Sequence, residues 1–348
     1  MGKHYLFFVS LTYSYSILRP LQAEIWRRGD DAAWFIESSC ENWLIEGERH
    51  LENIQEVLRY KPIAVFSPGN WVYDFLPGIK VAVFHGYAMK KRIEKIDDHF
   101  AIRAWYDIYC TQGESSTPYF KELEKKHGFF KVYETGWCKV DAFFASSTHA
   151  LEGGTQPTIL YSPTFSKGVS SAPYLFETIK TMAESKPWNW IITFHPKLDD
   201  PELIKKYKEL AETKPNVVFN RSNDGLNTFR KADVMLCDSS SIIVEFMLLE
   251  KPVVTFRNTH PGNYLLDVLD ENEIEAAIEQ AISRPKELMD NIHAYTMCHE
   301  PHRDGRNSAR VLDAVDDFIL NYKGKIKSKP FNLIRKIRIR FQAKYYHW

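Results

Sequence analysis

Short apolar runs alternate with amphipathic segments along the whole chain. Runs such as 5–10 and 81–84 consist mostly of large apolar residues, which is typical of buried parallel strands. Segments such as 17–28 and 201–212 instead place their apolar residues at helical spacing, with polar residues between them. Strands that alternate with helices in this way predict an α/β fold, in which helices cover both faces of a parallel sheet.

The alternation runs through the chain twice. In the first half we expect strands at 5–10, 33–36, 63–66, 81–84, 107–110 and 131–134. In the second half we expect strands at 158–161, 190–194, 217–219, 234–237 and 253–256. Two such halves predict a central cleft lined by strand ends, because ligands bind beyond the carboxyl ends of parallel strands.

A small, polar, turn-rich segment at 146–157 marks the expected domain boundary. We therefore predict an N-terminal domain at 1–150, a C-terminal domain at 151–322 and a tail at 323–348. The length of 348 residues fits two domains of ordinary size.

Composition narrows the class of protein. The five cysteines are odd in number and none forms a CxxC pair, which disfavours a disulfide framework and a zinc site and suits a reducing cytoplasm. The apolar run at 5–9 is too short for a signal peptide, and no run reaches the length of a membrane span. We expect neither a metal nor another cofactor.

The neutral net charge hides a basic tail. From Lys323 onward the chain has nine Lys or Arg and no acid, interleaved with large apolar and aromatic residues. Interleaving of this kind favours an interfacial membrane anchor over a nucleic-acid contact. The alternative is a partly ordered, solvated tail. We predict a cytoplasmic protein that binds the anionic inner face of the cell membrane and no nucleic acid.

The candidate chemistry falls where strands end. His85 and Gly86 follow the strand at 81–84, and His195 follows the strand at 190–194. The glycine lets a ligand approach closely, and a neutral imidazole can take a proton from an attacking hydroxyl. His195 precedes a proline, so it lies at a strand-to-loop turn where it can stabilise phosphate charge. The alternative for His85 is an ordinary surface or capped histidine, and His195 on its own is a weak signal.

Residues 232–258 contain a strand, an abrupt polar turn, an apolar helix and a second strand. The turn consists of Asp238, Ser239, Ser240 and Ser241. Free backbone N–H groups and hydroxyls at such a helix start suit a phosphate, although serines there also serve as plain N-caps. Glu245 is the only charge inside the apolar helix. It binds a ribose diol, forms an internal salt bridge or takes a partly exposed position.

Several common sites lack their residues. The sequence contains no GxGxxG, no GxxxxGK[ST] and no GxSxG, so Rossmann dinucleotide, P-loop and hydrolase-elbow sites are disfavoured. His299 and His302 have no cysteine partners at zinc spacing.

Six motifs in a fixed order resemble those of the CDP-glycerol glycerophosphotransferase family, whose GT-B-fold enzymes build teichoic-acid-like and capsular poly(alditol phosphate). They are His85-Gly86 with Lys90-Lys91, Gly136 with Lys139 and Asp141, Tyr161-Ser162-Pro163-Thr164, His195-Pro196, Asp238-Ser239-Ser240-Ser241 with Glu245, and Asp304-Gly305-Arg306 with Ser308 and Arg310. The resemblance extends over about residues 80–310. Its specificity lies in the order and spacing of the motifs rather than in any one of them.

This resemblance implies two Rossmann-like domains, an acceptor-binding one at 1–150 and a donor-binding one at 151–322. It implies transfer of glycerol phosphate from CDP-glycerol to a hydroxyl of a lipid-linked glycan acceptor, with release of CMP. His85 would be the base and His195 a phosphate-contacting or second catalytic histidine. The substrates would be contacted by Gly86, Lys139, Ser162, Thr164, Asp238, Ser239, Ser240, Ser241 and Glu245.

The sequence departs from the family pattern at three places. Ser239 stands at the usual aromatic position, Trp137-Cys138 stands where an aromatic and a proline are frequent, and Tyr87 replaces a threonine after His85-Gly86. These departures leave the donor open, so CDP-ribitol or another nucleotide-linked group also fits.

A second resemblance points to another enzyme class. The segments 238–246, 251–259 and 304–310 also resemble UDP-N-acetylglucosamine 2-epimerases, which share the GT-B architecture. Their acidic catalytic set has no obvious counterpart here. An epimerase, an ordinary nucleotide-sugar glycosyltransferase and a non-catalytic GT-B membrane scaffold remain the alternatives.

Overall fold

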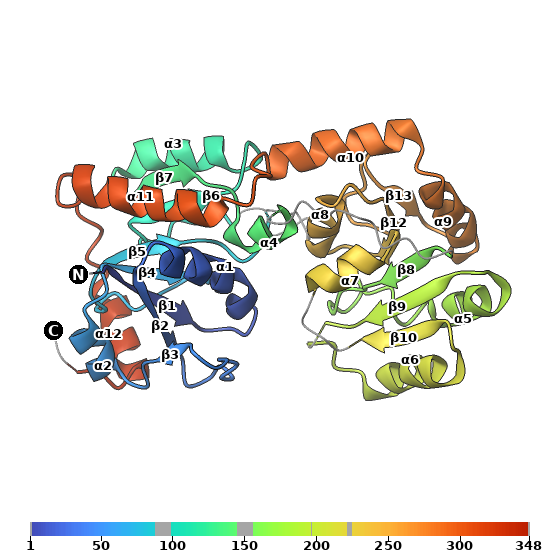
Figure 1. The fold of residues 1–348 in the computed structure, drawn as a ribbon, viewed down its shortest axis with the longest axis horizontal. Coiled ribbons are helices and arrows are strands. Elements are labelled where there is room, and N and C mark those ends of the chain that lie inside the picture. The colour runs from blue at the N-terminus through green and yellow to red at the C-terminus, as the bar shows by residue number, and fades with distance from the viewer. Residues whose placement is uncertain (1, 88–98, 145–155, 196, 221–224, 347–348) are drawn as a thin grey trace. The chain divides into compact units, whose positions relative to one another are not determined.

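The computed structural model describes residues 2–87, 99–144, 156–195, 197–220 and 225–346. The chain forms two compact units, each with its own parallel sheet and surrounding helices (Figure 1). Unit 1 comprises Met1–Tyr87, Asp97–Ala145 and His299–Trp348, and unit 2 comprises Ala88–Ile96 and Ser146–Cys298. The predicted α/β class with two parallel sheets is confirmed.

Unit 1 is built on a seven-stranded sheet in the order β3-β2-β1-β4-β5-β6-β7, in which every neighbouring pair is parallel. Its strands are β1 (His4–Val9), β2 (Asp31–Ile36), β3 (Arg49–His50), β4 (Ala64–Ser67), β5 (Ile79–Ala82), β6 (Ile108–Thr111) and β7 (Lys131–Glu134). Its helices are α1 (Ser14–Arg27), α2 (Ile54–Tyr60), α3 (Thr117–His127), α4 (Asp141–Phe144), α11 (Asn307–Asn321) and α12 (Leu333–Gln342), with a 3-10 turn η1 (Cys138–Val140).

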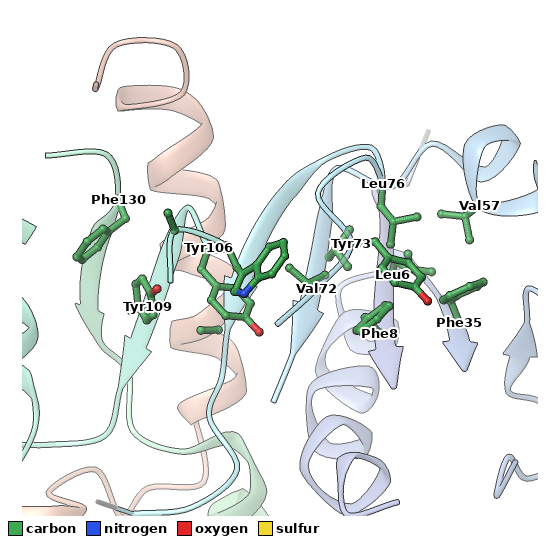
Figure 2. Close-up of a cluster of buried hydrophobic side chains, with 14 of the residues drawn as sticks. Leu6, Phe8, Phe35, Val57, Val72, Tyr73, Leu76, Tyr106, Tyr109 and Phe130 are labelled. Atoms are coloured by element: carbon green, nitrogen blue, oxygen red, sulfur yellow. The ribbon is translucent and has the colours of Figure 1, made fainter. Parts of the chain in front are cut away.

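The core of unit 1 follows from the period of its strands. Leu6 and Phe8 lie two positions apart in β1, so their side chains share one face of the sheet, where both are fully buried. Figure 2 shows them beside Phe35 of β2, within one apolar cluster. The cluster extends to Ile339 of α12. Burial of each such side chain contributes roughly 1.5–3 kcal/mol, so the C-terminal helix is part of the folded unit.

Helix α11 belongs to unit 1, whereas the sequence assigned residues up to 322 to the C-terminal domain. Its apolar face is buried, and its polar face pairs with residues of unit 1. Arg28 forms an ion pair of 2.8 Å with Asp313, and the hydroxyl of Tyr133 donates to Asp317 over 2.5 Å. The apolar spacing of this segment is that of a helix covering a sheet, but it does not identify which sheet.

Unit 2 contains a six-stranded parallel sheet in the order β10-β9-β8-β11-β12-β13. Its strands are β8 (Thr158–Tyr161), β9 (Asn189–Thr193), β10 (Val217–Asn220), β11 (Val234–Cys237), β12 (Val253–Phe256) and β13 (Leu266–Val268). Its helices are α5 (Phe176–Ser185), α6 (Pro201–Thr213), α7 (Gly225–Lys231), α8 (Ile242–Met247), α9 (Ile274–Ile282) and α10 (Lys286–His299), with a 3-10 turn η2 (Glu271–Glu273).

Some predicted features fall on residues that the structure does not describe. Most of the expected boundary at 146–157 lies outside the described residues, as do Lys90 and Lys91. Among the helices that the structure describes, none is both long enough and apolar enough to cross a membrane.

Candidate functional site

His85 lies beyond the carboxyl end of β5, and its side chain is exposed. Its Nδ1 is 3.1 Å from the carbonyl oxygen of Pro68. Because a carbonyl oxygen can only accept, Nδ1 carries the proton in this contact, and the neutral ring keeps its lone pair on Nε2. The ring of Tyr13 stacks on the imidazole, with 5.4 Å between ring centroids. Nε2 is thus the ring atom that can accept a proton from a hydroxyl.

The backbone on both sides of His85 is fixed by hydrogen bonds. Phe84 has a φ of 53°, a left-handed conformation that costs a non-glycine residue roughly 1–2 kcal/mol. Nε1 of Trp137 donates to the carbonyl of Phe84 over 3.3 Å, and Nε2 of Gln112 donates to the carbonyl of Gly86 over 3.0 Å. These contacts place the His85 loop at the strand end.

A fully buried carboxylate, Glu300, holds the same loop from behind. Its Oε2 accepts from the hydroxyl of Tyr87 over 3.0 Å and from the backbone N–H of Trp137 over 2.9 Å. Its Oε1 accepts from Nδ2 of Asn307 over 3.2 Å. Burial outweighs these hydrogen bonds and raises the pKa of Glu300 to about 8. Sequence reasoning missed Glu300, because it stands in a polar stretch that is typical of a loop.

Gly136 and Asp141 connect this network to the start of α11. Gly136 has a φ of 73°, and a Cβ there would lie 2.4 Å from Oδ1 of Asn307 and 2.5 Å from Oε1 of Glu300. Asp141 accepts from the backbone N–H groups of Asn307 and Ser308, each over 2.7 Å. The glycine and aspartate of the G-x-x-K-x-D motif therefore build the scaffold behind His85.

The last motif is also internal to unit 1. Arg310 forms a two-pronged ion pair with Asp304, over 2.9 and 2.6 Å, and donates to Oδ1 of Asn307 over 3.0 Å. This pair lowers the pKa of Asp304. Lys139 lies in η1 with its Nζ 5.0 Å from the centre of the Trp137 ring.

His195 has the opposite proton arrangement to His85. It is exposed beyond β9, and its Nδ1 accepts from the backbone N–H of Lys197 over 3.0 Å. A ring nitrogen that accepts from a backbone N–H carries no proton, so the neutral ring has its proton on Nε2. The ring of Phe165 packs on the imidazole with 4.3 Å between centroids. Nε2–H of His195 is therefore a hydrogen-bond donor suited to a phosphate oxygen.

Asp238 lies at the end of β11, where it is fully buried. It accepts from the backbone N–H groups of Thr164, Ser171 and Ser239 over 2.7–3.1 Å, and from the hydroxyl of Ser171 over 3.0 Å. Burial raises the pKa of this carboxyl, while these hydrogen bonds oppose the rise. Asp238 thus ties the loop after β8 to the serine turn.

The serine turn is tied to the strand beside it. Oγ of Ser239 accepts from the backbone N–H of Thr259 over 2.9 Å, and Nδ2 of Asn258 donates to the Asp238 carbonyl over 2.7 Å. Ser240 and Ser241 are half-buried. The following helix α8 has six residues.

The predicted site residues fall into two groups, one in each unit. Unit 1 holds His85, Gly86 and Lys139. Unit 2 holds His195, Ser162, Thr164, Asp238, Ser239, Ser240, Ser241 and Glu245. The buried members of the second group are Ser162, Thr164, Asp238, Ser239 and Glu245. Within the described part of the chain, no cluster of three or more His, Cys, Asp or Glu side chains is arranged to hold a metal ion.

Comparison with known proteins identifies a family. Residues 86–317 match the sequence model of CDP-glycerol:poly(glycerophosphate) glycerophosphotransferases. This stretch contains five of the six motifs in full. It begins at Gly86, so His85 of the first motif lies one residue before the match. No curated protein matches the sequence.

Solved structures with the same fold are distant in sequence. A Listeria monocytogenes protein assigned as a UDP-N-acetylglucosamine 2-epimerase is 15% identical, with a TM-score of 0.63 over 92% of this chain and 97% of that one. A variant of the wall teichoic acid polymerase TagF is 13% identical, with a TM-score of 0.63 over 90% and 89%. A second TagF variant, soaked with CDPG, is 12% identical, with a TM-score of 0.62 over 91% and 88%. These neighbours are GT-B enzymes, so the predicted GT-B-like fold is confirmed. The predicted cleft stays a prediction.

Proposed function

Because the chain belongs to the CDP-glycerol:poly(glycerophosphate) glycerophosphotransferase family, we propose that it transfers glycerol phosphate from CDP-glycerol to a hydroxyl of a lipid-linked glycan acceptor and releases CMP. The observation that carries this proposal is the pair of exposed histidines with opposite proton arrangements. His85 presents a lone pair on Nε2, and His195 presents a proton on Nε2. A group of the first kind can act as a general base on the attacking hydroxyl, and a group of the second kind can stabilise charge on the phosphates.

His85 acts as the general base. Its Nε2 takes the proton of the acceptor hydroxyl while the hydroxyl oxygen attacks the β-phosphorus of CDP-glycerol. The new P–O bond forms as the bond between this phosphorus and the bridging oxygen breaks, and CMP leaves with that oxygen. In the imidazolium that forms, Nδ1–H still donates a hydrogen bond to the Pro68 carbonyl. This hydrogen bond stabilises the charged ring.

His195 stabilises the departing charge. Its Nε2–H donates to an oxygen of the pyrophosphate, and the hydroxyls of Ser240 and Ser241 add donors at the end of β11. Asp238 plays a positioning part, because its oxygens hold the backbone of Thr164 and of Ser239. Glu245 takes the ribose diol, and Ser162, Thr164, Ser239, Gly86 and Lys139 complete the substrate contacts.

The tail supports attachment to an anionic membrane. One face of α12 is docked on unit 1, where Arg340 pairs with Asp74 over 3.1 Å. The opposite face presents Ile334, Ile337 and Phe341, which are 86%, 37% and 64% exposed and which we call the outer stripe of α12. Residues at this spacing share one helix face. Apolar residues flanked by lysines and arginines insert at the surface of anionic lipid.

Histidine variants test the catalytic assignment. His85→Ala should lower the rate of CMP release by about 10²–10⁴, the usual effect of losing a general base, while the Kd for CDP-glycerol stays near that of the wild type. His195→Ala should lower kcat as well. His127→Ala in unit 1 and His293→Ala in unit 2 are matched controls, because neither lies at a strand end. CMP release by His85→Ala at the wild-type rate would refute the assignment.

A further inference from the structure

A cavity of about 450 Å³ opens in unit 2, beyond the carboxyl ends of β12 and β13. It is lined by Tyr174, Phe256, Arg257, Leu269, Asp270 and Glu271. Two of its large side chains, Tyr174 and Leu269, are 55% and 67% exposed. Aromatic and apolar surface that is left open beside charged groups is typical of a binding site.

Arg257 is exposed at this cavity, and three contacts orient its side chain. Its φ of 54° is left-handed, and such strain in a non-glycine residue is concentrated at functional positions. The guanidinium carbon lies 4.6 Å from the ring centre of Phe256 and 5.5 Å from that of Tyr174. Its Nε donates to the Leu269 carbonyl over 3.1 Å, and its backbone N–H donates to Val268 over 2.9 Å. The side chain is therefore ordered before any ligand binds.

The hydrogen bond to Leu269 uses Nε of Arg257, so the N–H groups of the two terminal nitrogens can donate to a ligand. Among the described residues no carboxylate forms an ion pair with Arg257, although Asp270 and Glu271 line the same cavity. Asp270 already accepts from the backbone and side chain of Asn272, over 3.0 and 2.8 Å. An ordered guanidinium with open N–H groups matches the planar geometry of a phosphate.

The other lining groups select the kind of phosphate. The carboxylates of Asp270 and Glu271 accept hydrogen bonds from hydroxyl groups, and they repel a densely charged group such as a pyrophosphate. The open ring of Tyr174 provides a flat apolar surface for a carbon chain. A phosphodiester with a single negative charge, joined to a short polyol, satisfies all three features.

We propose that this cavity binds one glycerol phosphate unit of the growing poly(glycerol phosphate) chain, with the phosphodiester on Arg257 and the glycerol between Tyr174 and Glu271. The site rests on the proposed function and adds repeated transfer to it, so that the acceptor carries glycerol phosphate units already added by the same activity. The cavity adjoins the proposed donor contacts: Arg257 lines the cavity, and Nδ2 of the next residue, Asn258, donates to the Asp238 carbonyl of the serine turn.

Binding measurements on the full chain test the site. The probe is a soluble oligo(glycerol phosphate), with binding measured by calorimetry. Arg257→Gln should weaken binding about tenfold to a hundredfold, the effect of losing charge-assisted hydrogen bonds. Arg257→Lys keeps the charge but loses the planar fork, so an intermediate loss is expected. Arg284→Gln is the matched control, because Arg284 is also a left-handed arginine of unit 2, outside the cavity. It should bind like the wild type.

Three results would overturn the site. They are wild-type binding by Arg257→Gln, an equal loss in the Arg284→Gln control, and a loss that appears only with phosphatidylglycerol vesicles and not with the soluble oligomer. Inorganic phosphate should bind more weakly than the oligomer, and equal affinities would contradict the glycerol contact. Nucleotide release separates this test from the proposed function: Arg257-dependent oligomer binding without CMP release would refute the function and leave the site standing.

Discussion

Replacement of Glu300 by Gln gives a pH-dependent change in stability whose sign the structure fixes. In the folded protein the pKa of Glu300 is raised to about 8 from 4.5, mainly by burial. Between these two values the folded carboxyl binds a proton that the unfolded one has lost. Stability therefore falls as pH rises through this range.

The magnitude follows from the two pKa values. One pH unit corresponds to about 1.4 kcal/mol, so the raised pKa of Glu300 costs the folded state on the order of 5 kcal/mol by pH 8. This contribution is absent below pH 4.5, where both states are protonated. Gln cannot ionise, so Glu300→Gln removes the pH-dependent part. The substitution also adds a constant cost of roughly 1–3 kcal/mol. The NH2 group of the glutamine would face the N–H groups from which Glu300 accepts hydrogen bonds.

The assay is urea unfolding at pH 5, 6, 7 and 8, followed by tryptophan fluorescence, because Trp137 donates directly to Glu300. The free energy of unfolding of unit 1 should decline with pH in the wild type more steeply than in Glu300→Gln. Asp304→Asn is the control of opposite sign. The pKa of Asp304 is lowered by Arg310, so its contribution is already complete at pH 5 and stays constant up to pH 8.

A constant difference between wild type and Glu300→Gln from pH 5 to pH 8 would refute the reasoning. It would mean that Glu300 is ionised throughout and that its hydrogen bonds, rather than its burial, set its pKa. A difference that instead grows with pH in favour of the wild type would have the opposite sign to the expected one and would also refute the reasoning.

Three further changes test the scaffold and the tail. Gly136→Ala should destabilise unit 1 by roughly 2–5 kcal/mol, from left-handed strain and a clash at 2.4 Å; Gly168→Ala, left-handed but open, should show the strain alone in thermal melts. Asp238→Asn should lower the unfolding midpoint of unit 2 and weaken CDP-glycerol binding in calorimetry, because one acceptor oxygen is replaced by an NH2 group that faces buried donors. Unchanged values for both would contradict the positioning part of Asp238. Serines in place of the outer stripe of α12 should reduce co-sedimentation with anionic vesicles, unlike Leu320→Ser on α11; equal sedimentation would contradict the anchor.

The strand ends were predictable because a buried parallel strand has a strong local signal. The apolar runs placed His85 and His195 after strands, and both lie there in the structure. The tautomers of these rings were not predictable. They depend on the Pro68 carbonyl for His85 and on a turn within the His195 loop, and neither contact follows from apolar periodicity.

The scaffold behind His85 could not be predicted from the sequence. Glu300 and Trp137 are 163 positions apart, and they meet only because α11 packs on unit 1. The apolar face of α11 fits a sheet of either unit equally well. Asp238 shows the reverse case, since an acid at a strand end suggested a ligand contact, while the structure surrounds it with backbone donors.

The structure of the C-terminal tail was predictable in part. Its alternating basic and apolar residues predicted an interfacial segment, and α12 does present an exposed apolar stripe. The docking of its other face was not predictable, because Asp74, the partner of Arg340, lies 266 positions away along the chain. Tertiary ion pairs of this kind leave no periodic signal.

Nucleotide release is the most direct test of the proposed activity. The wild-type protein is incubated with a lipid-linked acceptor and, in turn, with CDP-glycerol, CDP-ribitol and UDP-N-acetylglucosamine, and the released nucleotides are quantified. The proposed function predicts CMP from CDP-glycerol, together with an acceptor lengthened by glycerol phosphate. Turnover of UDP-N-acetylglucosamine without any CMP release from CDP-glycerol would contradict it.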